Sequence, residues 1–214
     1  MNIVCFGDSN THGYNPANGG RFDKDTRWTG RLQKLLGEEY YVIEEGLSGR
    51  TTVFNDPIHE GLSGIDYIYP CLMTHEPIDL LIIMLGTNDT KERFGASAQV
   101  ISIGLSRLIK KAQDTKEAFR NNNPNILMVA PLPIRKEIEN VECYATMGKE
   151  CSRKSYEIIH LYKNVAKELG CHYFNPSPYA VCSDYDYMHL DEEAHDVLAN
   201  KLHGIIKNLN LRGN

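Results

Sequence analysis

The sequence lacks the features that mark several large classes of protein. No apolar run approaches the roughly 20 residues that a membrane-spanning helix needs, so we expect no membrane partner. Positive charge is not in excess, and the formal net charge of -5 argues against nucleic acid as a partner. Internal repeats and low-complexity linkers are also missing. With 214 residues, of which 42% are hydrophobic, the chain is expected to form one globular domain over residues 1–214.

The sequence also lacks the spacings of a metal site. Its six cysteines form no C-x-x-C pair. His189 and His195 are six residues apart, which does not bring them to one face of a helix. We therefore expect no metal and no cofactor. Because disulfide frameworks belong mainly to small secreted domains, we expect reduced cysteines and a cytoplasmic location.

Segments typical of strands and of helices alternate along the chain. The expected strands are 2–6, 40–43, 79–85, 126–130 and 172–174. The expected helices are 27–36, about 65–73, 98–119, 152–169 and a last one that begins after an N-cap at Asp191. Such alternation predicts an α/β fold with right-handed crossovers. We expect a three-layer α/β/α domain with a five-stranded parallel sheet of flavodoxin-like type.

Polar, glycine-containing clusters follow the first three expected strands. They are Gly7-Asp8-Ser9, Gly46-Leu47-Ser48-Gly49 and Gly86-Thr87-Asn88-Asp89. The carboxyl ends of parallel strands share one rim, and in the order 2-1-3-4-5 the first and third strands are neighbours where a crevice opens. Each cluster alone is typical of a turn. Three clusters on one crevice predict a functional site.

A fourth stretch, residues 186–189, leaves the last expected strand and returns across the same rim. Hydrolysis by a serine needs a hydroxyl, an imidazole that takes its proton, and a carboxylate that orients the imidazole. It also needs hydrogen-bond donors aimed at the developing oxyanion. Ser9, His189, Asp186 and Asn88 supply these groups. The other hydrolase pattern, G-x-S-x-G, does not occur in the chain.

These four stretches resemble the sequence blocks of the SGNH, or GDSL, hydrolases, in the family's order and spacing across nearly the whole chain. The stretches RWTG, VIEEGLSGRTT and LIIMLGTNDTK resemble the arylesterase and acyltransferase branch of that family. The resemblance implies that Ser9 is the nucleophile, that His189 is the general base and then the general acid, and that Asp186 orients His189. It also implies an oxyanion hole formed by the backbone N–H groups of Ser9 and Gly49 and by the side-chain amide of Asn88.

For several residues the sequence is consistent with more than one role. His12 and Tyr14 are candidate walls of the substrate pocket or ordinary packing residues. Asn10 stands where the family often has an apolar residue, which puts the packing behind the nucleophile in question. Arg50 is expected to pair with either Asp8 or Asp89. Further apolar walls are expected from Trp28, Tyr67, Tyr69 and the segment 131–150, which forms part of the pocket rim or an oligomer contact.

The expected function is a serine esterase that hydrolyses short-chain acyl esters, aryl or alkyl, with acyl transfer to alcohols as a second outcome. A carbohydrate O-acetylesterase or a thioesterase would use the same triad. A flavodoxin-like ligand-binding protein is the alternative without catalysis, but it leaves Asp186 and His189 unexplained. The partner is then a small-molecule ester, and the resemblance to the acyltransferase branch implies a homo-oligomer.

Overall fold

A computed structural model describes residues 1–209 and 211, and it contains the parallel sheet that the sequence predicts. Its five strands lie in the order β4-β1-β5-β6-β7, which confirms the expected order 2-1-3-4-5. The strands are β1 (Asn2–Gly7), β4 (Tyr41–Gly46), β5 (Leu80–Met84), β6 (Ile126–Val129) and β7 (His172–Phe174). All four pairings are parallel, and β1 has partners on both sides, with Gly7 opposite both Gly46 and Met84.

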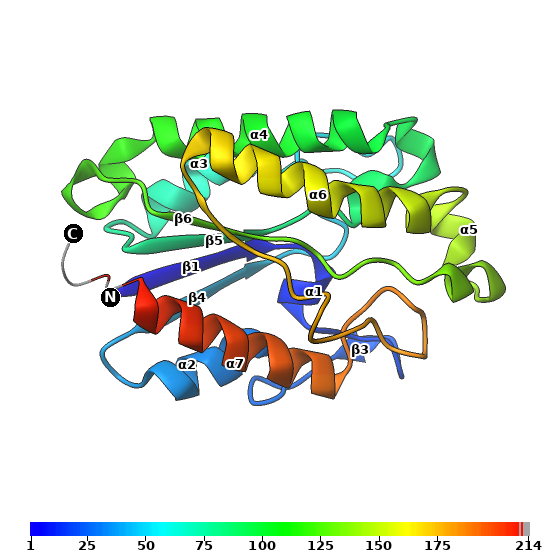
Figure 1. Ribbon diagram of the computed structural model, residues 1–214, viewed down its shortest axis with the longest axis horizontal. Helices are drawn as coiled ribbons and strands as arrows, with labels where there is room; N and C mark the ends of the chain where they lie inside the picture. The colour runs from blue at the N-terminus through cyan, green and yellow to red at the C-terminus, as the bar shows by residue number, and fades with distance from the viewer. Residues whose placement is uncertain (210, 212–214) are drawn as a thin grey trace.

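Helices cover both faces of the sheet, as Figure 1 shows. One layer holds α3 (Gly64–Thr74), α4 (Ala98–Asp114) and α6 (Cys151–Leu169), and the other holds α2 (Trp28–Leu36) and α7 (Glu192–Asn208). Successive residues of β1 serve the two layers in turn. Ile3 and Cys5 pack with α2 and α7, whereas Val4 and Phe6 pack with α3, α4 and α6. The α/β/α architecture is therefore confirmed.

Short elements make up the rest of the described chain. A one-turn helix, α1 (Ser9–His12), follows β1, and a small hairpin of β2 (Tyr14–Asn15) and β3 (Gly20–Arg21) follows α1. The helix α5 (Tyr144–Met147) lies at the end of the sheet where α1 lies (Figure 1). Turns of 3-10 helix occupy Asn88–Thr90, Glu92–Phe94, Lys116–Ala118, Arg120–Asn122 and Lys136–Asn140.

The predicted helix over 98–119 is wrong at its carboxyl end, because α4 stops at Asp114. Thr115 leaves the helical conformation, and its hydroxyl donates to the carbonyl of Lys111 at 2.9 Å. Phe119 is buried and forms an isolated parallel bridge with Ile78 beside the sheet. This contact between segments far apart in sequence overrides the helical pattern.

Within residues 1–209 and 211, no helix combines the length and the apolar character needed to cross a membrane. The predicted domain, 1–214, also includes residues 210 and 212–214, which lie outside the described residues.

Candidate active site

Ser9 lies at the carboxyl end of β1, at the first position of α1. Asp8 caps this short helix, because its carboxylate accepts from the N–H of Asn10 at 2.9 Å. Gly13 ends the helix in the left-handed conformation, with φ of 84°. Gly7 has no space for a side chain, since a Cβ there would lie 2.0 Å from the hydroxyl oxygen of Thr11. The sequence GDSNTHG therefore folds into a tight strand-to-helix turn that presents Ser9.

His189 lies against Ser9, although the two residues are far apart in the sequence. The distance from His189 Nε2 to Ser9 Oγ is 2.9 Å, and that from His189 Nδ1 to Asp186 Oδ2 is 2.5 Å. The second oxygen of Asp186 accepts from the backbone N–H groups of Met188 and His189 at 3.1 and 2.9 Å. Serine hydroxyl, imidazole and carboxylate thus form one continuous chain.

The environment of Asp186 favours its charged form. Burial opposes the charge, but the hydrogen bonds from the His189 ring and from the backbone of His189 and Met188 outweigh burial, and the pKa of Asp186 is lowered. A charged carboxylate at this position keeps a proton on Nδ1 of His189. That tautomer leaves Nε2 as an acceptor for the Ser9 hydroxyl.

Two further residues hold the His189 segment in place. The ring of Tyr14 packs against the imidazole, with 4.4 Å between ring centroids. The side-chain oxygen of Asn10 accepts from the backbone N–H of Leu190 at 2.9 Å, and the backbone carbonyl of Asn10 accepts from the Trp28 indole at 3.2 Å. Asn10, which the sequence left in question, is therefore a polar link between the Ser9 turn and the His189 turn.

Gly49 and Asn88 line the same cavity as Ser9. Gly49 has a φ of 89°, a conformation that favours glycine. One N–H of the Asn88 amide donates to the carbonyl of Arg50 at 3.2 Å, which leaves its second N–H for a ligand in the cavity.

Arg50 forms an ion pair with neither Asp8 nor Asp89, the two acids that the sequence suggested as partners. Its buried guanidinium donates to the backbone carbonyls of Gly7, at 2.9 Å, and Glu45. The guanidinium also lies over the rings of Phe6 and Tyr67, 4.2 and 5.3 Å from the centroids. Arg50 thus joins the ends of β1 and β4.

Asp89 is buried directly after Asn88. One of its carboxylate oxygens accepts from the backbone N–H and the hydroxyl of Thr52. Burial raises the pKa of Asp89 to about 6, and Asp8, another buried acid, adds to the rise. Burial also raises the pKa of Asp8. Asp89 therefore takes up a proton more readily in the folded protein than in water.

The cavity above Ser9 has a volume of about 440 Å³. One part of its wall is apolar and consists of Tyr14, Leu62, Cys143, Met147 and Met188. Another part is basic and consists of His59, Lys91 and Arg93. The segment 131–150 contributes Cys143, Thr146 and Met147, in line with its expected place at the rim. No sequence pattern indicated the basic part of the wall.

Other expected wall residues lie elsewhere. His12 lies beside Gly46 of β4 and close to Arg21, away from the cavity lining. Trp28 is buried in the core between the sheet and α2, and Tyr67 and Tyr69 are exposed on α3. An aromatic residue in a sequence pattern does not by itself distinguish such positions from a pocket wall.

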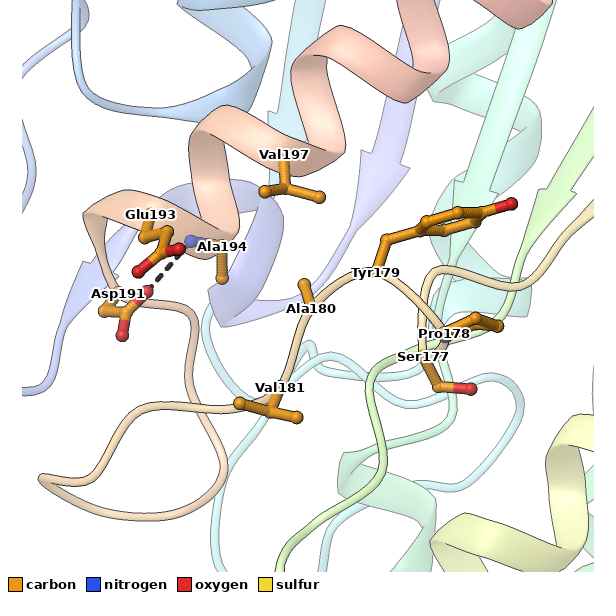
Figure 2. A pocket seen from close by; sticks show the side chains of 9 residues that line it. All are labelled: Ser177, Pro178, Tyr179, Ala180, Val181, Asp191, Glu193, Ala194 and Val197. Carbon is orange, nitrogen blue, oxygen red and sulfur yellow. Dashed lines mark hydrogen bonds between the residues drawn. The ribbon is translucent and has the colours of Figure 1, made fainter.

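Figure 2 shows a second cavity, of about 310 Å³, between residues 177–181 and the start of α7. Its Asp191 already caps α7, because the carboxylate accepts from the N–H of Ala194 at 2.9 Å. Ser9 and His189 are not part of its lining. The cavity above Ser9 is therefore the candidate active site.

Among the described residues, Glu45, Cys71 and His75 bring potential metal-ligand atoms within 4.8 Å of one another. The sequence did not reveal this group, because its members come from β4, from α3 and from the residue that follows α3. Nε2 of His75 lies 2.7 Å from the Glu45 carboxylate, so these two groups already bind each other. Burial raises the pKa of the Cys71 thiol to about 12, and the guanidinium of Arg50 lies nearby. A neutral thiol beside a cation is a poor ligand for a metal ion.

The sheet order, the site at the strand ends and the comparisons with known proteins together define a carboxylic ester hydrolase. The chain belongs to the GDSL-like lipase/acylhydrolase family, whose model matches residues 5–203. The structure of an aryl esterase from M. smegmatis is 34% identical, with a TM-score of 0.91 and coverage of 98% of this chain and 99% of that one. A carbohydrate acetylesterase from Sinorhizobium meliloti is 32% identical, with a TM-score of 0.92 and the same coverage. A comparison with curated protein sequences gave no match.

Proposed function

We propose that the protein hydrolyses short-chain acyl esters through an acyl-enzyme on Ser9. The observation that carries the proposal is the chain of contacts from Ser9 Oγ to His189 Nε2, 2.9 Å, and from His189 Nδ1 to Asp186, 2.5 Å. His189 takes the proton of the Ser9 hydroxyl as the oxygen attacks the ester carbonyl, and then gives that proton to the leaving alcohol. Water repeats the sequence on the acyl-enzyme and releases the acid.

The developing oxyanion is held by three donors. They are the backbone N–H groups of Ser9 and Gly49 and the second N–H of the Asn88 amide. Ser9 begins α1, so its N–H has no acceptor within the helix. Donors that are fixed before the reaction stabilise the tetrahedral intermediate without reorganisation.

The substrate class is an aryl or alkyl ester with a short acyl chain. Support comes from the cavity volume of about 440 Å³, which accepts a small ester, and from the similarity to the aryl esterase. A carbohydrate O-acetylesterase is the second candidate, favoured by the similarity to the carbohydrate acetylesterase. The triad itself does not distinguish an alcohol leaving group from a thiol.

We also propose acyl transfer to alcohols in water. The apolar wall formed by Tyr14, Leu62, Met147 and Met188 supports this proposal, because it binds the alkyl part of an alcohol and excludes water near the acyl-enzyme. A vinyl ester supplied with excess primary alcohol is expected to yield new ester. If only free acid forms at every alcohol concentration, acyl transfer is excluded.

We further propose that the protein forms a homo-oligomer and is located in the cytoplasm. The segment 179–185 exposes three large side chains, Tyr179, Val181 and Tyr185, that a second copy is able to cover. All six cysteines are unpaired, which suits a reducing compartment. Sedimentation velocity tests the oligomer, and a single monomeric species contradicts it.

The esterase proposal is tested with a panel of 4-nitrophenyl esters of increasing acyl length. We expect kcat/KM to be highest for the shortest chains. Ser9→Ala is expected to abolish turnover, whereas Ser48→Ala, which changes a second serine of the same cavity, retains it. Turnover that survives in Ser9→Ala overturns the proposal.

A further inference from the structure

Lys91 is a buried lysine whose charge has no partner. Its side chain lines the cavity that contains Ser9, and the residue is only 5% exposed. Among residues 1–209 and 211, no group forms a hydrogen bond or an ion pair with Nζ of Lys91. Lys154 is buried to the same extent, yet its Nζ donates to the carbonyl of Thr90 at 2.8 Å. Nζ of Lys91 is not among the fully buried polar atoms without a partner, so the ammonium remains accessible from the cavity and is available to a ligand there.

The acids whose charges act on Lys91 form no ion pair or hydrogen bond with it, and each binds another group. Asp56 forms an ion pair with Arg93, at 2.6 Å. Asp89 accepts from Thr52, and Asp8 accepts from the N–H of Asn10. Their charges attract that of Lys91 only across a distance, while burial and the guanidinium of Arg93 lower the pKa of Lys91. The cavity is therefore the place where a ligand can reach the ammonium of Lys91.

The lining of the cavity is suited to an anion. Lys91, Arg93 and His59 contribute to its wall, and none of the residues that line it is an aspartate or a glutamate. The nucleophile and the apolar wall lie in the same cavity. A ligand bound there brings one end to Ser9 and another toward Lys91.

We propose that the substrate is an ester that carries an anionic group, a carboxylate, and that Lys91 is the residue that selects it. This inference rests on the proposed esterase function and adds the charge of its substrate. A carboxylate in contact with Nζ of Lys91 forms a charge-assisted hydrogen bond, which is stronger than a neutral one. The carboxylate belongs either to the acyl part or to the alcohol part of the ester, and the experiment separates the two.

The experiment compares esters that differ only in charge. The acyl arm uses the mono-4-nitrophenyl ester of adipic acid and its neutral carboxamide analogue. The alcohol arm uses 4-acetoxybenzoate and 4-acetoxybenzamide. We expect kcat/KM to favour the carboxylate by about tenfold or more in one arm. We expect Lys91→Met to reduce that preference to about twofold or less.

Two controls identify the source of any change. Lys163→Met removes one positive charge from an exposed position on α6 and is expected to leave the preference unchanged. Lys91→Gln keeps a polar end without the charge, and circular dichroism checks that both Lys91 variants fold. If the preference is absent from the wild-type protein, or if Lys91→Met leaves it intact, the proposal is wrong.

A binding measurement separates this inference from the esterase proposal. Isothermal titration of Ser9→Ala with 4-hydroxybenzoate, 4-hydroxybenzamide and adipate needs no turnover. Tighter binding of a carboxylate that disappears in Ser9→Ala/Lys91→Met supports the role of Lys91 even if no ester is hydrolysed. Equal binding of charged and neutral ligands overturns it even if esters are hydrolysed.

Discussion

The side-chain oxygen of Asn10 accepts a hydrogen bond from the backbone N–H of Leu190 at 2.9 Å. Each of these residues directly follows a member of the proposed triad, Ser9 in one case and His189 in the other. The bond therefore sets the distance between the nucleophile and its base, and it does so from buried groups that water does not reach.

Asn10→Ala removes this link and leaves the N–H of Leu190 buried without an acceptor. We expect a loss of about 1–3 kcal/mol in the free energy of unfolding and a fall in kcat larger than the change in KM. Urea denaturation and steady-state kinetics measure the two effects. Asn200→Ala, on the exposed surface of α7, is the control. Unchanged stability and kcat in Asn10→Ala would show that the link is dispensable.

Asn88→Ala removes one proposed donor of the oxyanion hole. We expect kcat to fall by about 10²–10³ with little change in KM, because the donor acts on the transition state more than on the bound ester. The fold is expected to survive, since the amide holds only the carbonyl of Arg50. A kcat within a few-fold of the wild-type value means that Asn88 is merely a turn residue.

Asp186→Asn keeps the shape of the 186–189 turn but loses the charge. The amide no longer selects the tautomer of His189 in which Nδ1 carries the proton, so we expect kcat to fall by about 10⁴. The lowered pKa of Asp186 also gives the folded protein stability that is lost as the pH falls through that lowered value. Acid denaturation curves are expected to show this loss for the wild-type protein and not for Asp186→Asn.

Asp89 has the opposite effect on stability because its pKa is raised to about 6. The folded protein binds this proton more tightly than the unfolded chain, so the stabilisation is present below the ordinary aspartate pKa of 3.8 and is lost as the pH rises through about 6. We expect Asp89→Asn to remove about 3 kcal/mol of this pH dependence. Thermal unfolding of both proteins across this pH range measures it, and identical slopes contradict the assignment.

Local sequence patterns predicted most of the fold and the residues of the candidate triad. The strand β5, Leu80–Met84, is apolar throughout, and Asp191 caps α7 as its position indicates. What the patterns missed depends on contacts between distant segments. Phe119 beside Ile78 ends α4 early, and Arg50 binds backbone carbonyls, which no side-chain pattern reveals.

The basic wall was missed for a related reason. Lys91 directly follows the GTNDT stretch, where it has the sequence pattern of an ordinary surface residue. The residue is buried and its ammonium has no partner, and neither fact can be read from the sequence. Both depend on how the chain folds after the 3-10 turn at Asn88–Thr90.

The central claim is that Ser9 is the nucleophile, and covalent labelling tests it most directly. The protein is treated with a fluorophosphonate, and peptide mass spectrometry then locates the label. The account predicts one label per chain on Ser9, with none in Ser9→Ala and normal labelling in Ser48→Ala. A label on Ser48 or Ser63, or labelling that persists in Ser9→Ala, would contradict it.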